Sequence, residues 1–401
     1  MPAYIYDGLR TPFGRHAGAL APIRPDDLLS DVIQHVIERN SFEQTDYEDV
    51  IAGCTNQAGE DARNIARHAG LMAGLPLETG GLTVNRLCGS GLAAILDAAR
   101  AVRCGEGELF VAGGTESMSR APFVFAKNET PFGRDLRVYD STIGARFPNP
   151  RIEKTFGNDS MPQTADNIAL EMDLSREAVD RYAAQSQARY NAALKSGFYD
   201  GELQTTEVPR GRRKPPVSVE QDEHPRPQST VDALSGLKPL FEGGVVTAGN
   251  ASGINDGAAA LIIGSREAGE RAGVRPRARI VSAAIAGVAP RLMGYGPVPS
   301  SEKALARAGL SVDDMDVIEI NEAFAAQVLG CTTRLSVDPT DPRLNPNGGA
   351  IAVGHPLGAS GARIALTATR QLEQMEGRYA LISMCIGVGQ GIAAVLERVT
   401  D

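Results

Sequence analysis

The same order of sequence patterns occurs twice in this chain, and a fold for it must accommodate that repetition. Asp49-Val50-Ile51 has a counterpart in Asp316-Val317-Ile318, and Ser90-Gly91 has one in Ser360-Gly361, at nearly the same separation along the chain. Each Ser-Gly pair precedes an alanine-rich helical pattern, an apolar strand pattern and a glycine-rich turn. The repetition therefore predicts two similar halves.

Short apolar segments alternate with helical patterns in both halves. We expect strands at residues 3–7, 49–54, 82–87, 108–112, 317–320 and 379–383, with helices between them, such as those at 25–37 and 92–102. Strands that alternate with helices predict an α/β protein with a mostly parallel, layered sheet.

Residues 121 to about 249 differ from both halves, because Pro and charged residues are frequent and sustained strands are few. Helical patterns cover residues 162–172 and 175–196, so we interpret this segment as an inserted domain. Its basic cluster is a phosphate site or, more simply, a solvated loop that ends at Pro215-Pro216. The cluster consists of Arg210, Arg212, Arg213 and Lys214.

Composition excludes several classes of protein. A chain of 401 residues is too long for one ordinary core, and its formal charge of -9 argues against a general nucleic-acid surface. No apolar run approaches the roughly 18 residues needed to cross a bilayer. The five cysteines form no CxxC pair and have no paired His, so no metal site is indicated. We expect a soluble protein in a reducing compartment, by default the cytoplasm.

Cys88 stands within Asn85-Arg86-Leu87-Cys88-Gly89-Ser90-Gly91, between a predicted strand and a predicted helix. A thiol at a helix N-terminus lies near unpaired N–H groups, which favour the thiolate, so Cys88 is a candidate nucleophile. The alternative is a small buried core cysteine.

His355 lies in a second glycine-rich segment, residues 347–358, and Pro356 is placed to open the next helix. It is the candidate base for the thiol. A satisfied structural histidine is the alternative.

Two further segments place polar groups at strand ends. Cys385 follows a strand, and the glycines after it, beginning with Gly387, expose N–H groups that suit an oxyanion. Asn321-Glu322 follows another strand, where α/β sheets bind ligands. For the second pair a helix cap is an equal alternative, since it requires no ligand.

Together these motifs resemble the thiolase family. NRLCGSG (85–91), NEAFAAQ (321–327), GGAIAVGHPLGASGAR (348–363) and CIGVGQG (385–391) stand in the family's order. VTAGNASGINDGAAA (246–260) is also similar, and the resemblance covers essentially the whole chain. It implies two similar five-layered αβαβα halves, the first formed by residues 1–120 and 250–274 and the second by 275–401. A loop domain, 121–249, would cover the CoA site, and the chain would form a dimer or tetramer.

Within the family the chain is most similar to bacterial 3-oxoadipyl-CoA thiolases. The segments involved are NQAGEDARNIAR (56–67), ESMSRAP (116–122), STIGARFPNP (141–150), DEHPRP (222–227) and AGVAPRLMGYGPVP (286–299). The resemblance implies an acyltransferase that cleaves a 3-oxoacyl-CoA with CoA, through an acyl-cysteine, to acetyl-CoA and a shortened acyl-CoA. An acetoacetyl-CoA or general 3-ketoacyl-CoA thiolase is the alternative. Some acetoacetyl-CoA thiolases carry His where this chain has Ser160, before Met161, which argues against a purely acetoacetyl role.

The resemblance also implies roles for single residues. Cys88 would be the acylated nucleophile, His355 would activate it, and Cys385 would move the α-carbon proton. Asn321 is similar to the residue that holds a water in one oxyanion hole, with His355 alongside. The backbone N–H groups of Cys88 and Gly387 would form the other hole.

For CoA, a substrate rather than a cofactor, the resemblance places Ser252 near the pantetheine and Arg226 near the adenine and phosphate end. Met161, Met293 and Phe324 fall at pocket-lining positions, although such residues commonly serve core packing.

A dicarboxylic substrate needs a cation for its distal carboxylate. We nominate Arg146 as a hypothesis, from its place in STIGARF.

Two rival functions remain. A non-catalytic acyl-CoA-binding relative would not need Cys88, His355 and Cys385 together. A condensing synthase of the ketoacyl type would use one Cys with two His, whereas here Cys385 takes the second His position.

Overall fold

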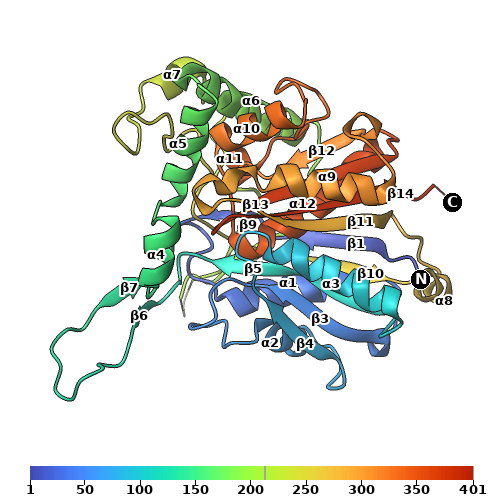
Figure 1. Cartoon of the computed structure of the whole chain (residues 1–401). Coiled ribbons are helices and arrows are strands. Elements are labelled where there is room, and N and C mark those ends of the chain that lie inside the picture. Colours follow the sequence, from blue (N-terminus) through green and yellow to red (C-terminus); the bar gives the residue numbers. More distant parts are fainter. Residues whose placement is uncertain (212–213, 401) are drawn as a thin grey trace.

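The structure, a computed structural model, describes residues 1–211 and 214–400. Its main sheet has ten strands in the order β12-β13-β14-β11-β1-β10-β5-β3-β4, with β2 beside β10. In Figure 1 the second half, in orange and red, lies above the first half, in blue and cyan, and β11 and β1 meet between them. The strands are β1 (Tyr4–Arg10), β2 (Gly14–Arg15), β3 (Tyr47–Gly53), β4 (Gly80–Val84), β5 (Leu109–Ser117), β10 (Asn255–Gly264), β11 (Ala278–Gly287), β12 (Val317–Ile320), β13 (Tyr379–Ile386) and β14 (Gln390–Arg398).

Both halves of the sheet repeat one pattern of strand order and direction. In β1-β10-β5-β3-β4 the first two pairs are antiparallel and the last two are parallel. The series β11-β14-β13-β12 has the same directions, and a parallel bridge from Ile318 to Leu344 takes the place of the fifth strand. The halves join where Tyr4 and Ile5 of β1 pair with β11. The repetition seen in the sequence is therefore a repetition of topology.

The expectation of a mostly parallel sheet is wrong. β10 and β14 each run antiparallel to both of their neighbours. β14 follows β13 through a tight turn at Val388 and Gly389, both of which have positive φ, and a strand reached by a hairpin must be antiparallel. β10 returns from the inserted segment rather than from a crossover helix.

The resemblance implied five layers in each half, but in the structure the two halves build five layers together, in the order helix, sheet, helix, sheet, helix. α1 (Pro25–Glu38) and α2 (Ile65–Met72) cover the outer face of the first half, and α9 (Pro297–Ala308) and α10 (Ala325–Arg334) cover that of the second. The central layer contains α3 (Ser90–Cys104) and α12 (Leu357–Gln374), one helix from each half. They approach so closely that a Cβ on Gly361 would lie 2.2 Å from the backbone N of Leu92. Each half thus contributes one helix of the central layer.

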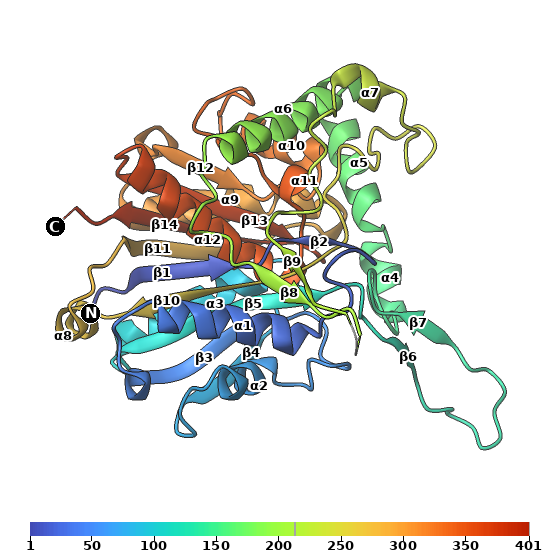
Figure 2. The ribbon, with the colours of Figure 1, turned by 180° about the vertical axis from the view of Figure 1, so that it is seen from behind.

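The inserted segment is mostly helical. The predicted helices at 162–172 and 175–196 are α5 (Met161–Glu171) and α6 (Arg176–Lys195). Figure 2 shows β6 (Phe123–Phe125) and β7 (Val138–Asp140) leading into a hairpin that extends away from the body of the molecule. The remaining elements are α4 (Pro150–Phe156), β8 (Thr206–Val208), β9 (Val217–Val219), α7 (Val231–Ser235), α8 (Arg266–Ala272) and α11 (Ala350–Val353), with 3-10 turns at Gln44–Asp46, Pro290–Tyr295 and Val312–Asp314.

Of the basic cluster, Arg210 and Lys214 are exposed, and Arg212 and Arg213 lie outside the described residues. The residue boundaries of the three domains stay predictions. Within residues 1–211 and 214–400, no helix is long and apolar enough to cross a membrane.

Candidate active site

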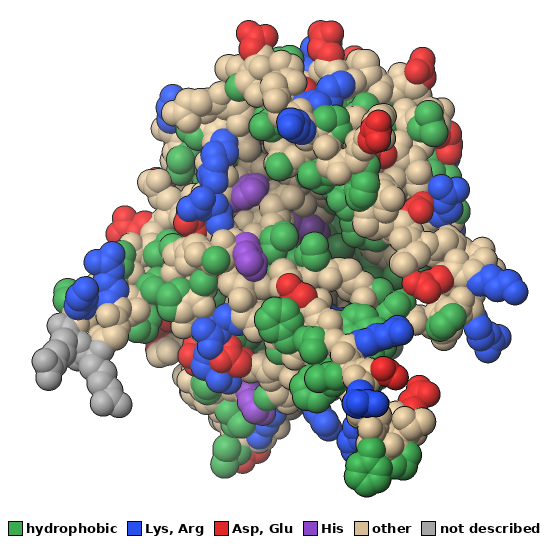
Figure 3. All heavy atoms as spheres, turned by 90° about the vertical axis from the view of Figure 1, so that its left-hand side faces the viewer, with side chains coloured by type: hydrophobic (Ala, Val, Ile, Leu, Met, Phe, Trp, Pro, Cys, Tyr) green, Lys and Arg blue, Asp and Glu red, His purple; other side chains and the backbone are tan. Residues whose placement is uncertain are grey.

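The candidate residues lie where the parallel strands of the sheet end. Cys385 is near the end of β13, Asn321 follows β12, and His355 lies between α11 and α12. Cys88 precedes α3. Figure 3 shows the side of the molecule that is at the left of Figure 1, and this side is hollowed, with hydrophobic and histidine side chains around the hollow.

A tight turn presents Cys88 in front of α3. Leu87 has a φ of 47°, in the left-handed region that few residues with a side chain adopt. Ser90 stabilises the turn, because its Oγ donates to the carbonyl of Leu87 at 2.6 Å and accepts from the N–H of Arg86 at 2.8 Å. Such strain in a glycine-flanked turn is typical of functional sites.

Cys88 is not pre-ionised, contrary to the expectation from its place at a helix N-terminus. Burial raises the pKa of its thiol to about 11, and the negative charge of Glu116 adds to the rise. The N–H groups of Gly387 and of Cys88 itself oppose this rise, and both are directed at the sulfur. Burial prevails because a thiolate is costly to desolvate. Cys88 therefore needs a base.

His355 is held in an orientation that suits a base. Its Nδ1 lies 2.6 Å from Oγ of Ser360, and this hydroxyl donates its own proton to the carbonyl of Pro356 at 2.9 Å. These contacts, and the donor-only Nδ2 of Asn321 beside Nε2, fit the tautomer in which Nδ1 donates the ring proton to Ser360 and Nε2 keeps its lone pair. Asn255 holds the same loop, since its Oδ1 accepts from the N–H of His355 at 2.9 Å.

Burial keeps this imidazole neutral. The pKa of His355 is lowered from 6.5 to about 3, first by desolvation and then by the nearby charge of Arg363. Its Nε2 lies 3.5 Å from Nδ2 of Asn321. Oδ1 of Asn321 is buried and has no hydrogen-bond partner among the described residues. An orphaned amide oxygen next to the base suits a bound water.

The structure decides between the two interpretations of Asn321-Glu322. α10 begins at Ala325 with no side-chain cap, so neither residue caps it. Glu322 instead accepts from the N–H of Ile351 in α11 at 3.1 Å and from Ser186 of α6 at 2.6 Å. It thus joins the inserted domain to the segment before His355.

Cys385 faces the same space as Cys88. Its side chain is buried, and the pKa of its thiol is well above the ordinary value, first through burial and then through the proximity of Cys88 and Cys331. Met293 and Phe324 pack in the same apolar cluster as Cys385. Met161, 38% exposed, borders the entrance, since a Cβ on Gly387 would lie 3.6 Å from its sulfur.

The remaining predicted residues lie further out. Ser252 donates its N–H to the carbonyl of Ala323 at 2.9 Å and so borders the cluster around Cys385. Arg226 is exposed on the inserted segment, with Nη1 2.8 Å from the carbonyl of His224. Arg146 is half-buried beside Asp61, and its charge lowers the pKa of that carboxyl against a larger effect of burial. None of the three touches the side chains of Cys88, His355 or Cys385 in the hydrogen bonds of the described residues.

Ser360 and Asn255 were missed as site residues by the sequence analysis. Ser360 was noted only as part of the repeated Ser-Gly pair. The available signal was a hydroxyl five residues after a histidine, in the first turns of the helix that Pro356 opens.

Comparison with known proteins identifies the family of this fold and site. The family model described as thiolase, N-terminal domain, matches residues 3–267, and that of the thiolase C-terminal domain matches residues 274–398. The chain belongs to the thiolase family. The thiolase fold expected from the motifs is thereby confirmed.

Thiolases of known name are similar over the full length. The chain is 54% identical over 399 residues to a 3-oxoadipyl-CoA/3-oxo-5,6-dehydrosuberyl-CoA thiolase of Escherichia coli (strain K12), covering 99% of each. It is 53% identical over 399 residues to a beta-ketoadipyl-CoA thiolase of Acinetobacter baylyi, again covering 99% of each.

Solved thiolase structures have the same fold. Human mitochondrial 3-ketoacyl-CoA thiolase superposes with a TM-score of 0.92 at 40% identity, covering 99% of each chain. The same human thiolase in complex with CoA gives a TM-score of 0.91 at 40% identity, covering 99% of this chain and 98% of that one.

Proposed function

We propose that this thiolase cleaves 3-oxoadipyl-CoA with CoA to acetyl-CoA and a shortened acyl-CoA. The observation that carries the proposal is the neutral imidazole of His355, with Nε2 free, at the same sheet edge as the partly exposed thiol of Cys88 and the buried thiol of Cys385. The substrate is inferred from the names of the relatives that are more than half identical to this chain.

In the first half-reaction Nε2 of His355 removes the proton of Cys88, and the sulfur attacks the C3 carbonyl of the substrate. The N–H groups of Gly387 and Cys88 stabilise the oxyanion that forms. The C2–C3 bond then breaks and its electron pair moves onto the thioester oxygen, which faces His355 and a water held by Asn321. Cys385 donates its proton to C2, and acetyl-CoA leaves.

In the second half-reaction the Cys385 thiolate takes the proton of a new CoA thiol. That thiol attacks the acyl group on Cys88, Cys88 leaves, and the imidazolium of His355 returns its proton to it. Each proton moved in the first half-reaction is thus restored. Sulfur suits the nucleophile because an acyl-cysteine is a thioester, close in energy to the acyl-CoA on either side.

CoA would enter past the inserted segment. We assign Ser252 to the pantetheine and Arg226 to the adenine and phosphate end, with Met161, Met293 and Phe324 around the acyl group. The CoA complex of the human relative supports a CoA site in this fold. The exposed Arg226 is free to meet a phosphate, since its present acceptors are backbone carbonyls.

A homo-oligomer, dimer or tetramer, is part of the proposal. Large apolar side chains of the β6–β7 hairpin are exposed in the single chain, among them Phe123 at 71% and Phe132 at 101%. Exposed groups of this kind commonly mark a protein interface. We also place the enzyme in the cytoplasm, because the reaction needs Cys88 and Cys385 as free thiols.

Two measurements test the function. Incubation with acetyl-CoA followed by peptide mass spectrometry should find acetyl on Cys88. A thiolysis panel should give the highest kcat/KM for 3-oxoadipyl-CoA, compared with acetoacetyl-CoA and longer 3-oxoacyl-CoAs. An unmodified Cys88 would refute the mechanism, and a preference for long straight chains would refute the substrate.

A further inference from the structure

Strand register makes Glu116 the counterpart of Cys385 in the other half. Glu116 of β5 lies opposite Gly257 of the neighbouring antiparallel strand, and Cys385 of β13 lies opposite Gly391. On the parallel side, Gly114 lies opposite Gly53 of β3 and Ser383 lies opposite Ile320 of β12. Gly53 follows Asp49 at the same spacing as Ile320 follows Asp316. Asp49 and Asp316 begin the two copies of the first repeated motif. The place that holds a catalytic thiol in one half therefore holds a buried carboxylate in the other.

Each of these two residues meets the beginning of a central helix from the other half. Cys385 faces Cys88, which precedes α3. Glu116 faces Gly358 in the first turn of α12, and Gly358 precedes Ser360 just as Cys88 precedes Ser90 in the repeat. The N–H of Gly358 donates to Oε2 of Glu116 at 3.1 Å. Where one half has a thiol facing a thiol, the other has a carboxylate bound to a backbone N–H.

Every hydrogen-bond partner of Glu116 among the described residues is a donor. Oε2 also accepts from the N–H of Thr55 at 3.0 Å, and Oε1 accepts from the N–H of Asn56 at 3.2 Å. The thiol of Cys54 lies 3.9 Å from Oε1 but donates its proton to the carbonyl of Asn56 at 3.0 Å. The side chain is only 2% exposed. Burial raises the pKa of Glu116 to about 7, while the three N–H groups oppose the rise. A carboxylate satisfies all these donors, whereas a Gln side chain would turn an NH₂ group towards some of them.

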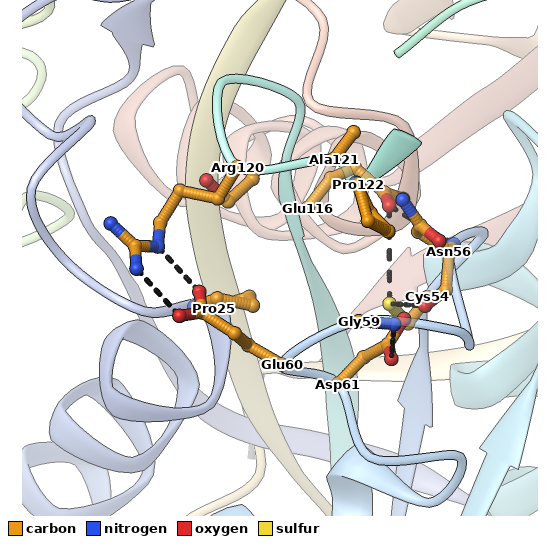
Figure 4. Close-up of a pocket in the computed structure, with 11 residues that line it drawn as sticks. Pro25, Cys54, Asn56, Gly59, Glu60, Asp61, Glu116, Arg120, Ala121 and Pro122 are labelled. Carbon is orange, nitrogen blue, oxygen red and sulfur yellow. Dashed lines mark hydrogen bonds and ion pairs between the residues drawn. The ribbon is translucent and has the colours of Figure 1, made fainter. Parts of the chain in front are cut away.

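The space beside Glu116 is too small for a substrate. Figure 4 shows the pocket, with Cys54, Asn56 and Glu116 on one side and the Arg120–Glu60 ion pair on the other. Its volume of about 10 Å³ admits at most one water. The first half thus has no second reaction site at this place. The carboxylate instead connects the chain segments whose N–H groups it accepts from.

Glu116 connects the segments that carry the nucleophile and the base. Thr55 accepts from Nδ2 of Asn85, in the turn of Cys88, at 3.1 Å. Gly358 lies between His355 and Ser360 along the chain. Gly358 cannot move inwards, since a Cβ there would already lie 2.1 Å from the carbonyl of Thr115. One carboxylate therefore joins the Cys88 side and the His355 side of the site.

We propose that Glu116 is a positioning residue for thiolysis, whose carboxylate sets the distance between His355 and Cys88 across the two halves. The inference rests on the proposed function. A shift of about 1 Å between reacting groups typically costs about 10² in rate. Ser252 and Arg226, which we assign to CoA, are not in hydrogen-bond contact with Glu116. Loss of the hydrogen bonds to the Glu116 carboxylate should therefore lower kcat and leave KM nearly unchanged.

The test compares Glu116→Gln and Glu116→Asp with Asp316→Asn. Asp316 is the control, because its carboxylate too accepts backbone N–H groups, those of Arg378 and Tyr379. These lie at the start of β13, away from the strand end that carries the site. We expect acetylation of Cys88 by acetyl-CoA and kcat of thiolysis to fall by about 10² in both Glu116 variants, with KM within about threefold of wild type. Asp316→Asn should keep both rates.

Several outcomes would overturn the proposal. They are rates within about threefold of wild type in either folded Glu116 variant, an equal loss in Asp316→Asn, or a rise in KM that accounts for the loss. Circular dichroism and thermal melting establish folding, and if Glu116→Gln does not fold, Glu116→Asp decides. If neither folds, Glu116 is a structural residue and the proposal fails. A wild-type enzyme that cleaves no 3-oxoacyl-CoA would instead refute the proposed function.

Discussion

Oγ of Ser360 lies 2.6 Å from Nδ1 of His355, and this contact determines which ring nitrogen can act as a base. With the hydroxyl proton directed at the carbonyl of Pro356, the hydroxyl accepts from the ring N–H at Nδ1. The lone pair of His355 is therefore on Nε2, the nitrogen that faces Asn321.

Replacing Ser360 with Ala should slow Cys88 acylation by about 10–10², because the ring loses the partner that holds its tautomer and orientation. Stopped-flow or quenched acetylation by acetyl-CoA measures this rate. Ser300→Ala is the control, since Ser300 is also buried in a helix and donates to the carbonyl four residues earlier, Gly296, at 2.8 Å. Equal rates in the two variants would show that Ser360 does not orient the base.

Acid should destabilise the fold partly through His355. Its pKa falls from 6.5 to about 3 on folding, so between these values the unfolded chain binds a proton that the folded chain does not. The free energy of unfolding should therefore decrease as the pH falls from about 6.5 towards 3. In His355→Asn the decrease, measured by denaturant melts at several pH values, should be shallower. His224, whose pKa is lowered to about 4, contributes equally to the pH dependence of the wild type and of His355→Asn. An unchanged slope would contradict the lowered pKa of His355.

Cys385→Ala should separate the two chemical steps. Acyl transfer from acetyl-CoA to Cys88 needs no proton at the α-carbon. Cys385 only protonates the leaving CoA, and a thiolate leaves without a proton far more readily than a carbanion, so acetylation should slow but continue. Thiolysis of a 3-oxoacyl-CoA should fall by about 10³ or more, because the carbanion loses its proton donor. Mass spectrometry and the thiolysis assay measure the two steps. Cys331→Ala, a buried cysteine behind Cys385, is the control, and thiolysis retained by Cys385→Ala would remove Cys385 from the mechanism.

Arg146→Ala tests the nominated partner of the distal carboxylate. If Arg146 binds it, kcat/KM for 3-oxoadipyl-CoA should fall by about 10–10² while that for acetoacetyl-CoA stays constant. The carboxylate of Asp61 lies near this guanidinium and competes with the distal carboxylate of the substrate for it. Asp61→Asn should therefore keep or increase the preference for 3-oxoadipyl-CoA over acetoacetyl-CoA. A preference unchanged in Arg146→Ala would refute the nomination.

Much of the fold followed from local patterns. The strand at Val317–Ile320 was predicted with its observed bounds, and the helices at 162–172 and 175–196 differ from α5 and α6 by one residue at each end. Hydrophobic periodicity suffices for this, because a strand or helix buries one face whatever its neighbours are. The strands β10 and β14 were not among those expected, and the prediction of a mostly parallel sheet failed because strand direction depends on how distant segments connect.

At the site, residue types and glycine-rich turns identified Cys88, His355, Asn321 and Cys385 as candidates. The ionisation of Cys88 was predicted in the wrong direction, because the helix N-terminus is visible in the sequence and the burial that outweighs it is not. The hydrogen bonds that Glu116 accepts could not be predicted either, because their donors are residues 55, 56 and 358, far from Glu116 along the chain.

Three properties could be read without coordinates: which side chains are available for chemistry, that the chain repeats, and that it resembles thiolases. Three others came from the packing of the two halves. The thiols of residues 88 and 385 lie close together, the base is neutral, and its Nε2 is the free nitrogen. The reason is physical, because local spacing sets backbone conformation within a few residues only. The packing of the two halves decides whether groups far apart along the chain lie close together and whether water reaches them.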